Sequence, residues 1–110
     1  MSNAVQKDVE NLVEKELKSA NEKFPMFHSA HEGYAVILEE FEETQCELEN
    51  LNNATCDLWE RVKDNATPER LNLHARAIKK YSINLACEAI QVAAMAQKFV
   101  DSLEVKNDKG

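Results

Sequence analysis

The sequence is poor in the residues that make tight turns. Its 110 residues include only two glycines and two prolines. Because an all-β fold needs many turns built from such residues, this composition disfavours it strongly. Hydrophobic residues make up 44% of the chain, which excludes disorder along its whole length. The expected fold is therefore all-α, as a single helical domain over residues 1–104, with residues 105–110 as a disordered tail.

Long hydrophobic runs and cysteine patterns are also missing. No apolar run approaches the roughly 18 residues that a membrane span needs, and the first residues lack the apolar segment of a signal peptide. The three cysteines, Cys46, Cys56 and Cys87, show no C-x-x-C spacing. We therefore expect a cytoplasmic protein with reduced thiols, no membrane partner, and neither a disulfide framework nor a zinc knuckle.

Positive charge is in short supply, since the net charge is −7. A broad nucleic-acid-binding face needs an excess of lysine and arginine, so nucleic acid is not an expected partner. Phosphorylated small molecules remain possible ligands, provided that divalent cations bridge them to the acidic side chains.

Apolar residues recur at three- and four-residue steps in three segments. The first predicted helix covers residues 5–24 and ends before Pro25, because the residue before a proline avoids helical torsion angles. The second begins at Ala30, behind a capping box of Ser29 and Glu32, and runs to about residue 64. Residues 50–55 are poor helix formers and are a predicted kink or break.

The third predicted helix starts at Pro68, with Thr67 as its N-cap, and continues to about Glu104. The second and third helices then form a long antiparallel hairpin of about 35 residues, or about 52 Å, per helix. A short first helix cannot cover two such helices. We therefore expect a second copy of the chain to complete a helical bundle, most simply as a dimer.

Residues 85–96 read LACEAIQVAAMA, which is apolar all around the helix except for Glu88 and Gln91. Such a segment is normally buried on all sides. A buried carboxylate without a partner costs several kcal/mol, roughly, so Glu88 needs a cation or a hydrogen-bonding partner.

The predicted hairpin supplies neighbours for both polar residues. A turn near Ala66 places Glu43 level with Glu88, and Glu40 level with Gln91. Several carboxylates at one level repel each other unless a cation lies among them, and hard oxygen ligands without histidine or cysteine suit Mg²⁺ or Mn²⁺. Two alternatives stay open: the glutamates form a solvated face, or Glu88 pairs with a basic side chain or hydrogen-bonds to Gln91.

These residues also resemble a known signature. Glu39, Glu40 and Glu43 fit E-E-x-x-E, and the segment from Glu88 to Gln91 resembles E-x-x-D. Together with the flanking HEGYAVILEEFEE and EAIQVAAMAQKFVDSL, they are similar to small phage and bacterial members of the MazG-like all-α nucleoside triphosphate pyrophosphohydrolases. The resemblance covers roughly residues 27–103.

The resemblance implies an Mg²⁺-dependent cleavage of a nucleoside triphosphate to its monophosphate and pyrophosphate, carried out by a dimer or tetramer. It implies Glu40, Glu43 and Glu88 as metal ligands, with Gln91 at the fourth ligand position, and Glu39 as the catalytic residue that orients water or holds a second metal. Two departures are plain: Gln91 replaces an aspartate, and the segment between the motifs is long. A catalytically inactive relative, acting as a helical interaction or regulatory module, is therefore the alternative.

Lys80, Asn84 and Lys98 lie on the same helical face as Glu88, at helical spacing. They are candidate substrate-binding residues that contact phosphate oxygens. The alternative is that they are ordinary surface side chains of a helix.

Overall fold

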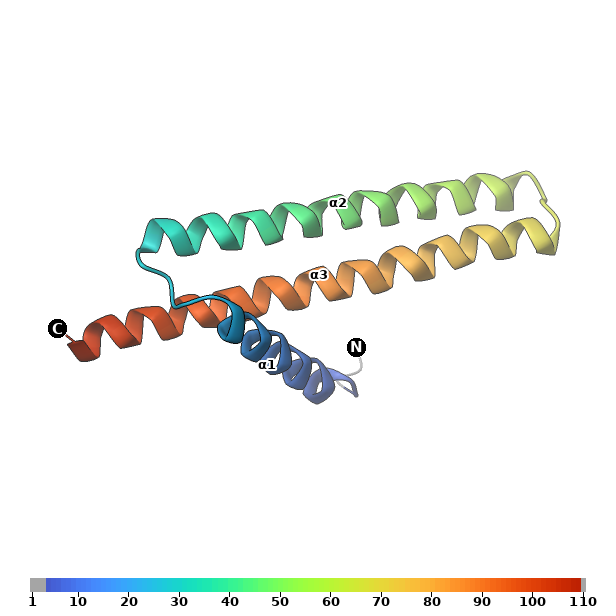
Figure 1. The fold of residues 1–110 in the computed structure, drawn as a ribbon. Coiled ribbons are helices and arrows are strands. Elements are labelled where there is room, and N and C mark those ends of the chain that lie inside the picture. Colours follow the sequence, from blue (N-terminus) through green and yellow to red (C-terminus); the bar gives the residue numbers. More distant parts are fainter. Residues whose placement is uncertain (1–3, 110) are drawn as a thin grey trace. The chain divides into compact units, whose positions relative to one another are not determined.

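The computed structural model describes the backbone of residues 4–109 and the side chains of residues 4–105. Three helices make up the regular structure of this part of the chain: α1 (Gln6–Lys23), α2 (Ala30–Lys63) and α3 (Pro68–Lys109) (Figure 1). The described residues include no strand, so the predicted all-α fold is confirmed. None of the helices has a stretch apolar and long enough to cross a membrane.

The starts of α2 and α3 follow the predicted capping residues. The Ser29 hydroxyl accepts a hydrogen bond of 3.1 Å from the backbone N–H of Glu32. The Thr67 hydroxyl accepts one of 3.3 Å from the backbone N–H of Arg70. Each bond satisfies one of the N–H groups that a helix leaves free at its first turn, so both N-caps are confirmed.

One prediction about an irregular segment was wrong. Residues 50–55 are continuous helix, with the Thr55 hydroxyl donating to the Leu51 carbonyl at 2.8 Å. The reason is that neither proline nor glycine interrupts the chain there, and weak helix formers alone cost too little to stop a long helix. The backbone of α3 is helical to Lys109, and the disorder expected of residues 105–110 stays a prediction. Gly110 lies outside the described residues.

The chain divides into two compact units, and the first comprises residues 1–41 and 89–110. It contains α1, the start of α2 and the second half of α3. Phe27, Ala94 and Met95 are the centre of its core. The residues packed against them come from all of its helical segments: Val13, Leu17, Ala20, Val36, Ile37 and Phe99.

Ser102 of α3 forms a hydrogen bond with the connection between α1 and α2. The backbone N–H of Phe27 donates to the Ser102 hydroxyl at 3.1 Å, and that hydroxyl donates to the Lys98 carbonyl at 2.8 Å. Gly33 permits the close packing of α2 on α3 here, because a Cβ at this position would overlap the Phe99 ring. The Phe27 ring is thereby held in the core.

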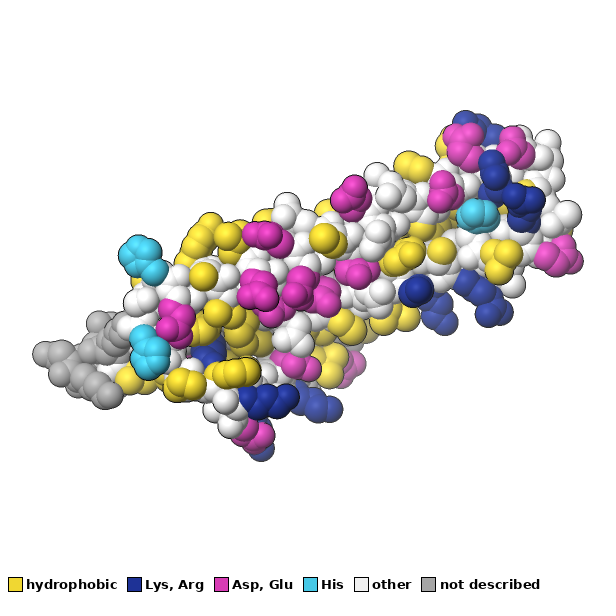
Figure 2. All heavy atoms as spheres, turned by 45° about the horizontal axis from the view of Figure 1, so that its top comes forward, with side chains coloured by type: hydrophobic (Ala, Val, Ile, Leu, Met, Phe, Trp, Pro, Cys, Tyr) yellow, Lys and Arg dark blue, Asp and Glu magenta, His cyan; other side chains and the backbone are white. Residues whose placement is uncertain are grey.

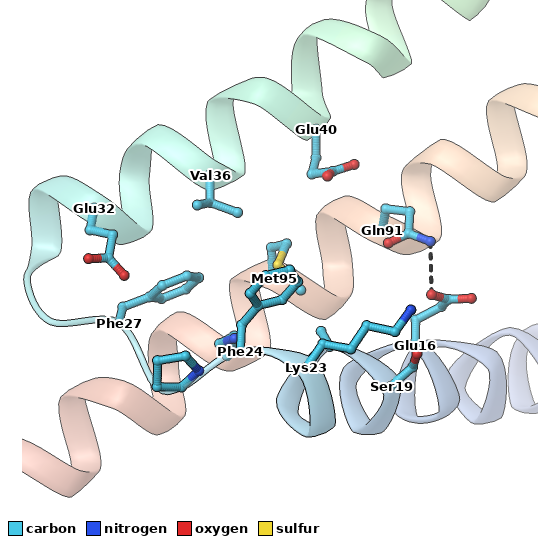
Figure 3. Close-up of a pocket in the computed structure, with 13 residues that line it drawn as sticks. Glu16, Ser19, Lys23, Phe24, Phe27, Glu32, Val36, Glu40, Gln91 and Met95 are labelled. Carbon is cyan, nitrogen blue, oxygen red and sulfur yellow. Dashed lines mark hydrogen bonds between the residues drawn. The ribbon is translucent and has the colours of Figure 1, made fainter.

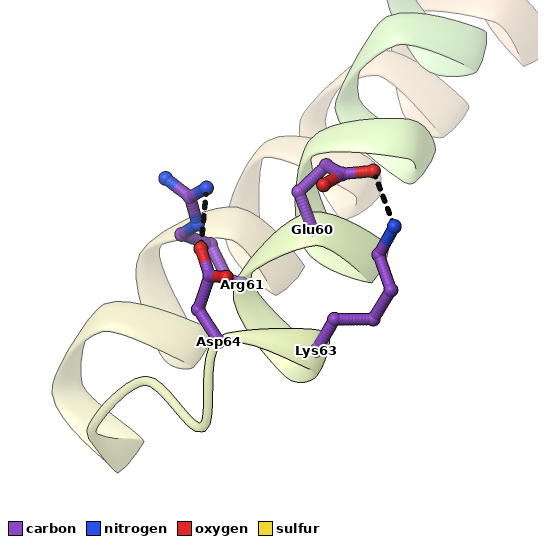
Figure 4. A network of polar contacts seen from close by, with 4 residues as sticks. All are labelled: Glu60, Arg61, Lys63 and Asp64. Carbon is purple, nitrogen blue, oxygen red and sulfur yellow. Dashed lines mark hydrogen bonds and ion pairs between the residues drawn. The ribbon is translucent and has the colours of Figure 1, made fainter.

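The second unit, residues 42–88, is a hairpin of two antiparallel helical segments. Asn65, with φ of 56°, ends α2 in the left-handed conformation that asparagine tolerates, and the N–H of Ala66 returns to the Arg61 carbonyl at 3.0 Å. Two ion pairs lie at the end of α2: Arg61 with Asp64 at 2.9 Å, and Lys63 with Glu60 at 2.8 Å (Figure 4). The predicted turn near Ala66 is confirmed.

The hairpin unit has very little core. Ala54 is its one buried hydrophobic residue among those described. Large apolar side chains remain exposed along it, namely Leu48, Trp59, Val62, Leu73 and Ile83. Hydrophobic side chains are visible between acidic ones over much of the face drawn in Figure 2.

The apolar segment 85–96 was expected to be buried on all sides, and in the single chain it is not. Ala94 and Met95 are buried, but Cys87 is exposed, as are Ala89 and Ala93. A helix in the single chain has neighbours on only part of its circumference, so the other side of this segment faces outward. Cys46 and Cys56 are likewise free and exposed, as expected of reduced thiols.

Candidate metal centre

Carboxylates from the two predicted motifs lie close together. In the hairpin unit, Glu43 of α2 and Glu88 of α3 each offer an oxygen within 4.8 Å of the other. Glu40 precedes Glu43 by one turn, so the two lie on the same face of α2. We call Glu40, Glu43 and Glu88 the acidic cluster. The structure thus brings together Glu43 and Glu88, two of the three glutamates predicted as metal ligands.

The surroundings of Glu88 disfavour its negative charge. Burial raises the pKa of the Glu88 carboxyl above its usual range, and a hydrogen bond and the negative charge of Glu43 raise it further. The charge of Glu47 acts in the same direction. Carboxylates this close can share a proton, or they can share a cation. A hard divalent cation such as Mg²⁺ suits this donor set because it reduces the repulsion and prefers oxygen ligands.

Glu47 was missed by sequence reasoning. It follows Glu43 by four residues and Glu40 by seven, so all three lie on one face of α2. Its Oε2 atom is buried, with no hydrogen-bond partner among the described residues. The helical spacing was a signal that could have found it, but the E-E-x-x-E pattern ends one turn earlier.

Glu39, the predicted catalytic residue, is exposed on α2 and does not belong to the acidic cluster. Successive residues of a helix point about 100° apart, so Glu39 leaves α2 in a different direction from Glu40. Glu39 is therefore next to Glu40 in the sequence but points in another direction, and its catalytic role stays a prediction.

Gln91 makes a contact that the sequence did not predict. Its amide nitrogen donates a hydrogen bond of 2.9 Å to a carboxylate oxygen of Glu16 on α1 (Figure 3). The amide oxygen, which is the atom of a glutamine that can bind a cation, takes no part in this bond. Gln91 and Glu16 both belong to the first unit, so their hydrogen bond joins α3 to α1 within that unit.

A cavity of about 530 Å³ lies in the first unit. Its walls include Glu16 and Gln91, the cluster residue Glu40, and apolar side chains of the core (Figure 3). The apolar and aromatic residues that line it are Ala20, Phe24, Pro25, Phe27, Val36 and Met95. This volume lies in the range of small-molecule sites, which combine a mostly apolar lining with a few polar groups.

The three predicted substrate-binding residues are not brought together. Lys98 lines the cavity of the first unit. Lys80 and Asn84 line a different, open hollow on the hairpin unit, together with Arg76, Lys79 and Ile83. Residues on one face of α3 therefore do not all line one site, because these three are spread over several turns of the helix. Their contacts with phosphate stay a prediction.

Comparisons with protein-family models, curated proteins and solved structures find no match to this chain. The resemblance to the MazG-like pyrophosphohydrolases therefore depends on the two short motifs and their flanks. The proximity of Glu43 and Glu88 in the hairpin unit is an observation independent of the sequence motifs.

Proposed function

We propose that this protein is an Mg²⁺-dependent nucleotide pyrophosphohydrolase, which cleaves a (deoxy)nucleoside triphosphate to the monophosphate and pyrophosphate. The observation that carries the proposal is the proximity of Glu43 and Glu88, two of the three acids that the MazG-like pattern assigns to metal binding. The third, Glu40, lies one turn before Glu43 on the same face of α2. The raised pKa of Glu88 adds support, because it reports negative charge crowded at that point.

In this proposal Glu40, Glu43 and Glu88 hold Mg²⁺, or Mn²⁺ in its place. Such an ion neutralises phosphate charge and lowers the pKa of a bound water. Glu47 stabilises the ion through its charge at one turn's distance. Glu39 is the proposed residue for orienting the attacking water, since it is adjacent along α2 and accessible to solvent.

The proposal includes a second copy of the chain. The hairpin unit leaves Leu48, Trp59 and Leu73 more than half exposed. Exposed apolar side chains in a row are typical of association surfaces, and two copies of a helical hairpin can cover each other's apolar sides as a four-helix bundle. The exposed side of segment 85–96, which includes Ala89, would be covered in the same way.

The test is pyrophosphate release from a panel of NTPs and dNTPs in the presence of Mg²⁺. We expect release by the wild-type protein and a loss of at least about a hundredfold in Glu88→Gln, because the change removes a charged ligand. Glu42→Gln is the matched control, since Glu42 is exposed on α2 outside the cluster and its substitution should leave the rate unchanged. Full activity in Glu88→Gln would contradict the assignment.

A non-catalytic helical module is the second candidate, and the Gln91–Glu16 hydrogen bond favours it. An aspartate at position 91 would face the Glu16 carboxylate and be repelled by it. This chain therefore has a structural contact where the family pattern has an acid. The module predicts no pyrophosphate release and no rise in melting temperature with Mg²⁺. The double variant Gln91→Asp with Glu16→Gln keeps a hydrogen-bonding pair and restores the acid, and under the enzyme proposal it should bind Mg²⁺ more tightly than wild type.

A further inference from the structure

Lys98 is a buried lysine that faces a cavity. The residue is 2% exposed, yet it lines the cavity of the first unit. The structure places no ion pair or side-chain hydrogen bond on its Nζ among the residues described. An ammonium group has three N–H donors and no acceptor, so a lysine that lines a cavity can donate to an oxygen of a ligand in that cavity.

The neighbours of the Lys98 ammonium are aromatic. Its Nζ lies 5.1 Å from the ring centroid of Phe27 and 6.0 Å from that of Phe24. The Ser102 hydroxyl bridges the Lys98 carbonyl and the Phe27 backbone, which joins the backbone at Phe27 to that of α3. Phe24 is 64% exposed, so its ring surface is available to a ligand. The cavity thus offers an ammonium donor next to flat apolar surfaces.

The aromatic rings of the cavity lie away from Glu40 and Gln91. Figure 3 shows Glu40 and Gln91 at one side, Phe27 with Glu32 at the opposite side, and Met95 and Phe24 between them. The proposed metal-bound phosphates belong near Glu40, which leaves the ring side for the remainder of the same molecule. A planar heterocycle fits this lining, because aromatic rings and methionine pack well on flat apolar groups.

We infer that this cavity takes the base of the nucleotide, and that Lys98 donates a hydrogen bond to a carbonyl oxygen of that base. The inference rests on the proposed function and adds to it a selection among bases. An ammonium group only donates, so it suits the carbonyl of uracil, thymine, guanine or hypoxanthine. At the equivalent position adenine carries an amino group, which would leave both donors without an acceptor.

Glu32 strengthens this selection. Its carboxylate lines the same cavity and is drawn beside Phe27 (Figure 3). A carboxylate accepts hydrogen bonds, so it suits the ring N–H that neighbours the carbonyl in each of these bases. A site that pairs with both groups rejects the analogue in which donor and acceptor are reversed, because its own buried polar group would then stay unpaired.

The test compares inosine with adenosine, which differ only in carrying a carbonyl with a ring N–H or an amino group with a bare ring nitrogen. Binding to the full chain is followed through the ¹³C-methyl signal of Met95, which lines the cavity, with a chelator present so that no metal contributes. We expect inosine to bind more tightly than adenosine by a factor of about ten or more, which is the effect of one hydrogen bond to a charged group. Lys98→Met, which matches the length of lysine, should abolish the preference.

Lys80→Met is the matched control, since Lys80 is exposed and lines the other hollow; it should keep the preference. Equal binding of the two nucleosides to wild type, or a Met95 signal that neither nucleoside moves, would overturn the inference without any variant. A preference that survives in Lys98→Met would overturn the role of Lys98. Pyrophosphate release at the same rate for every base would support the proposed function and contradict this inference. Inosine-selective binding without pyrophosphate release would support this inference and contradict the proposed function.

Discussion

The two units of this protein differ in how many helical segments enclose their cores. In the first unit, α1, α2 and α3 surround Phe27, Ala94 and Met95. In the hairpin unit, residues 42–88, two segments bury only Ala54 among their hydrophobic residues. The same helix formers and the same apolar spacing run through both units. The difference teaches that a pair of helices has a contact line but no interior, and that a third helix creates one.

The difference extends to the polar groups. The first unit has enough interior to bury Lys98 and Ser102 beside a cavity. The hairpin unit brings Glu43 and Glu88 together at a partly exposed position between its two helical segments. Buried polar side chains beside a cavity therefore occur with the three-segment core, whereas a pair of close carboxylates needs only two facing helices.

The largest expected effect separates the two cores directly. Met95→Ala in the first unit should lower the free energy of unfolding by about 2–5 kcal/mol, because it leaves a cavity among packed side chains. Leu73→Ala in the hairpin unit should cost less than about 0.5 kcal/mol in the monomer, since Leu73 is 68% exposed. Urea unfolding of dilute protein measures both. Equal losses would mean that the two cores do not differ as described.

A second substitution tests how closely the helices of the first unit pack. Gly33→Ala should destabilise the protein by about 1–3 kcal/mol, because the added methyl overlaps the Phe99 ring. Combining it with Phe99→Leu should recover part of the loss, since leucine occupies less of that space. A Gly33→Ala protein as stable as wild type would show that α2 can move away from α3 at little cost.

The hairpin unit should depend on a second copy. The proposed dimer predicts that wild-type stability rises by up to about 1.4 kcal/mol for each tenfold increase in protein concentration. Leu48→Lys with Leu73→Lys should abolish this dependence by placing charge in the apolar surface, whereas Gln45→Lys, a like change at an exposed polar position of α2, should keep it. Thermal melts over a hundredfold concentration range, with light scattering, provide the measurement. A concentration-independent wild type would contradict the dimer.

The smallest effect concerns the pKa of Glu88, which lies above its usual value in the folded protein. Protonation of Glu88 therefore favours folding: its contribution is complete below the ordinary pKa of 4.5 and is lost as pH rises through the raised value. With a chelator at pH 7, Glu88→Gln should be more stable than wild type by less than about 1 kcal/mol, and the difference should vanish near pH 4.

Added Mg²⁺ provides the control for that prediction. It should raise the melting temperature of wild type at pH 7 and leave Glu88→Gln unchanged, because only the charged cluster gains from a cation. A wild type that Mg²⁺ leaves unaffected would favour the non-catalytic module.

Local sequence signals predicted most of the fold. Ser29 and Thr67 marked the starts of α2 and α3, and Pro25 marked the stop after α1, because caps and breakers act within one turn of the chain. The proximity of Glu43 and Glu88 also followed from the sequence. A single short turn sets the register of an antiparallel hairpin, and the helical rise carries that register along both helices.

Local sequence signals did not predict three other features of the structure. The 50–55 segment stayed helical, because many small preferences along a long helix outweigh a few weak formers. The partner of Gln91 was missed because Glu16 lies 75 residues away and no periodicity connects the two. Lys98 looked like one of several lysines on α3, and only its burial distinguishes it from Lys80.

The sequence by itself determined the three helices, the two facing glutamate motifs and the shortage of apolar cover on the hairpin, since each follows from contacts within a few residues or from one short turn. Only the tertiary structure decided which polar residues become buried. Docking of α1 and of the loop at Phe27 against α3 encloses Lys98 beside a cavity and engages Gln91 with Glu16. Burial depends on which segments distant in the chain pack together, and helical spacing carries no information about that.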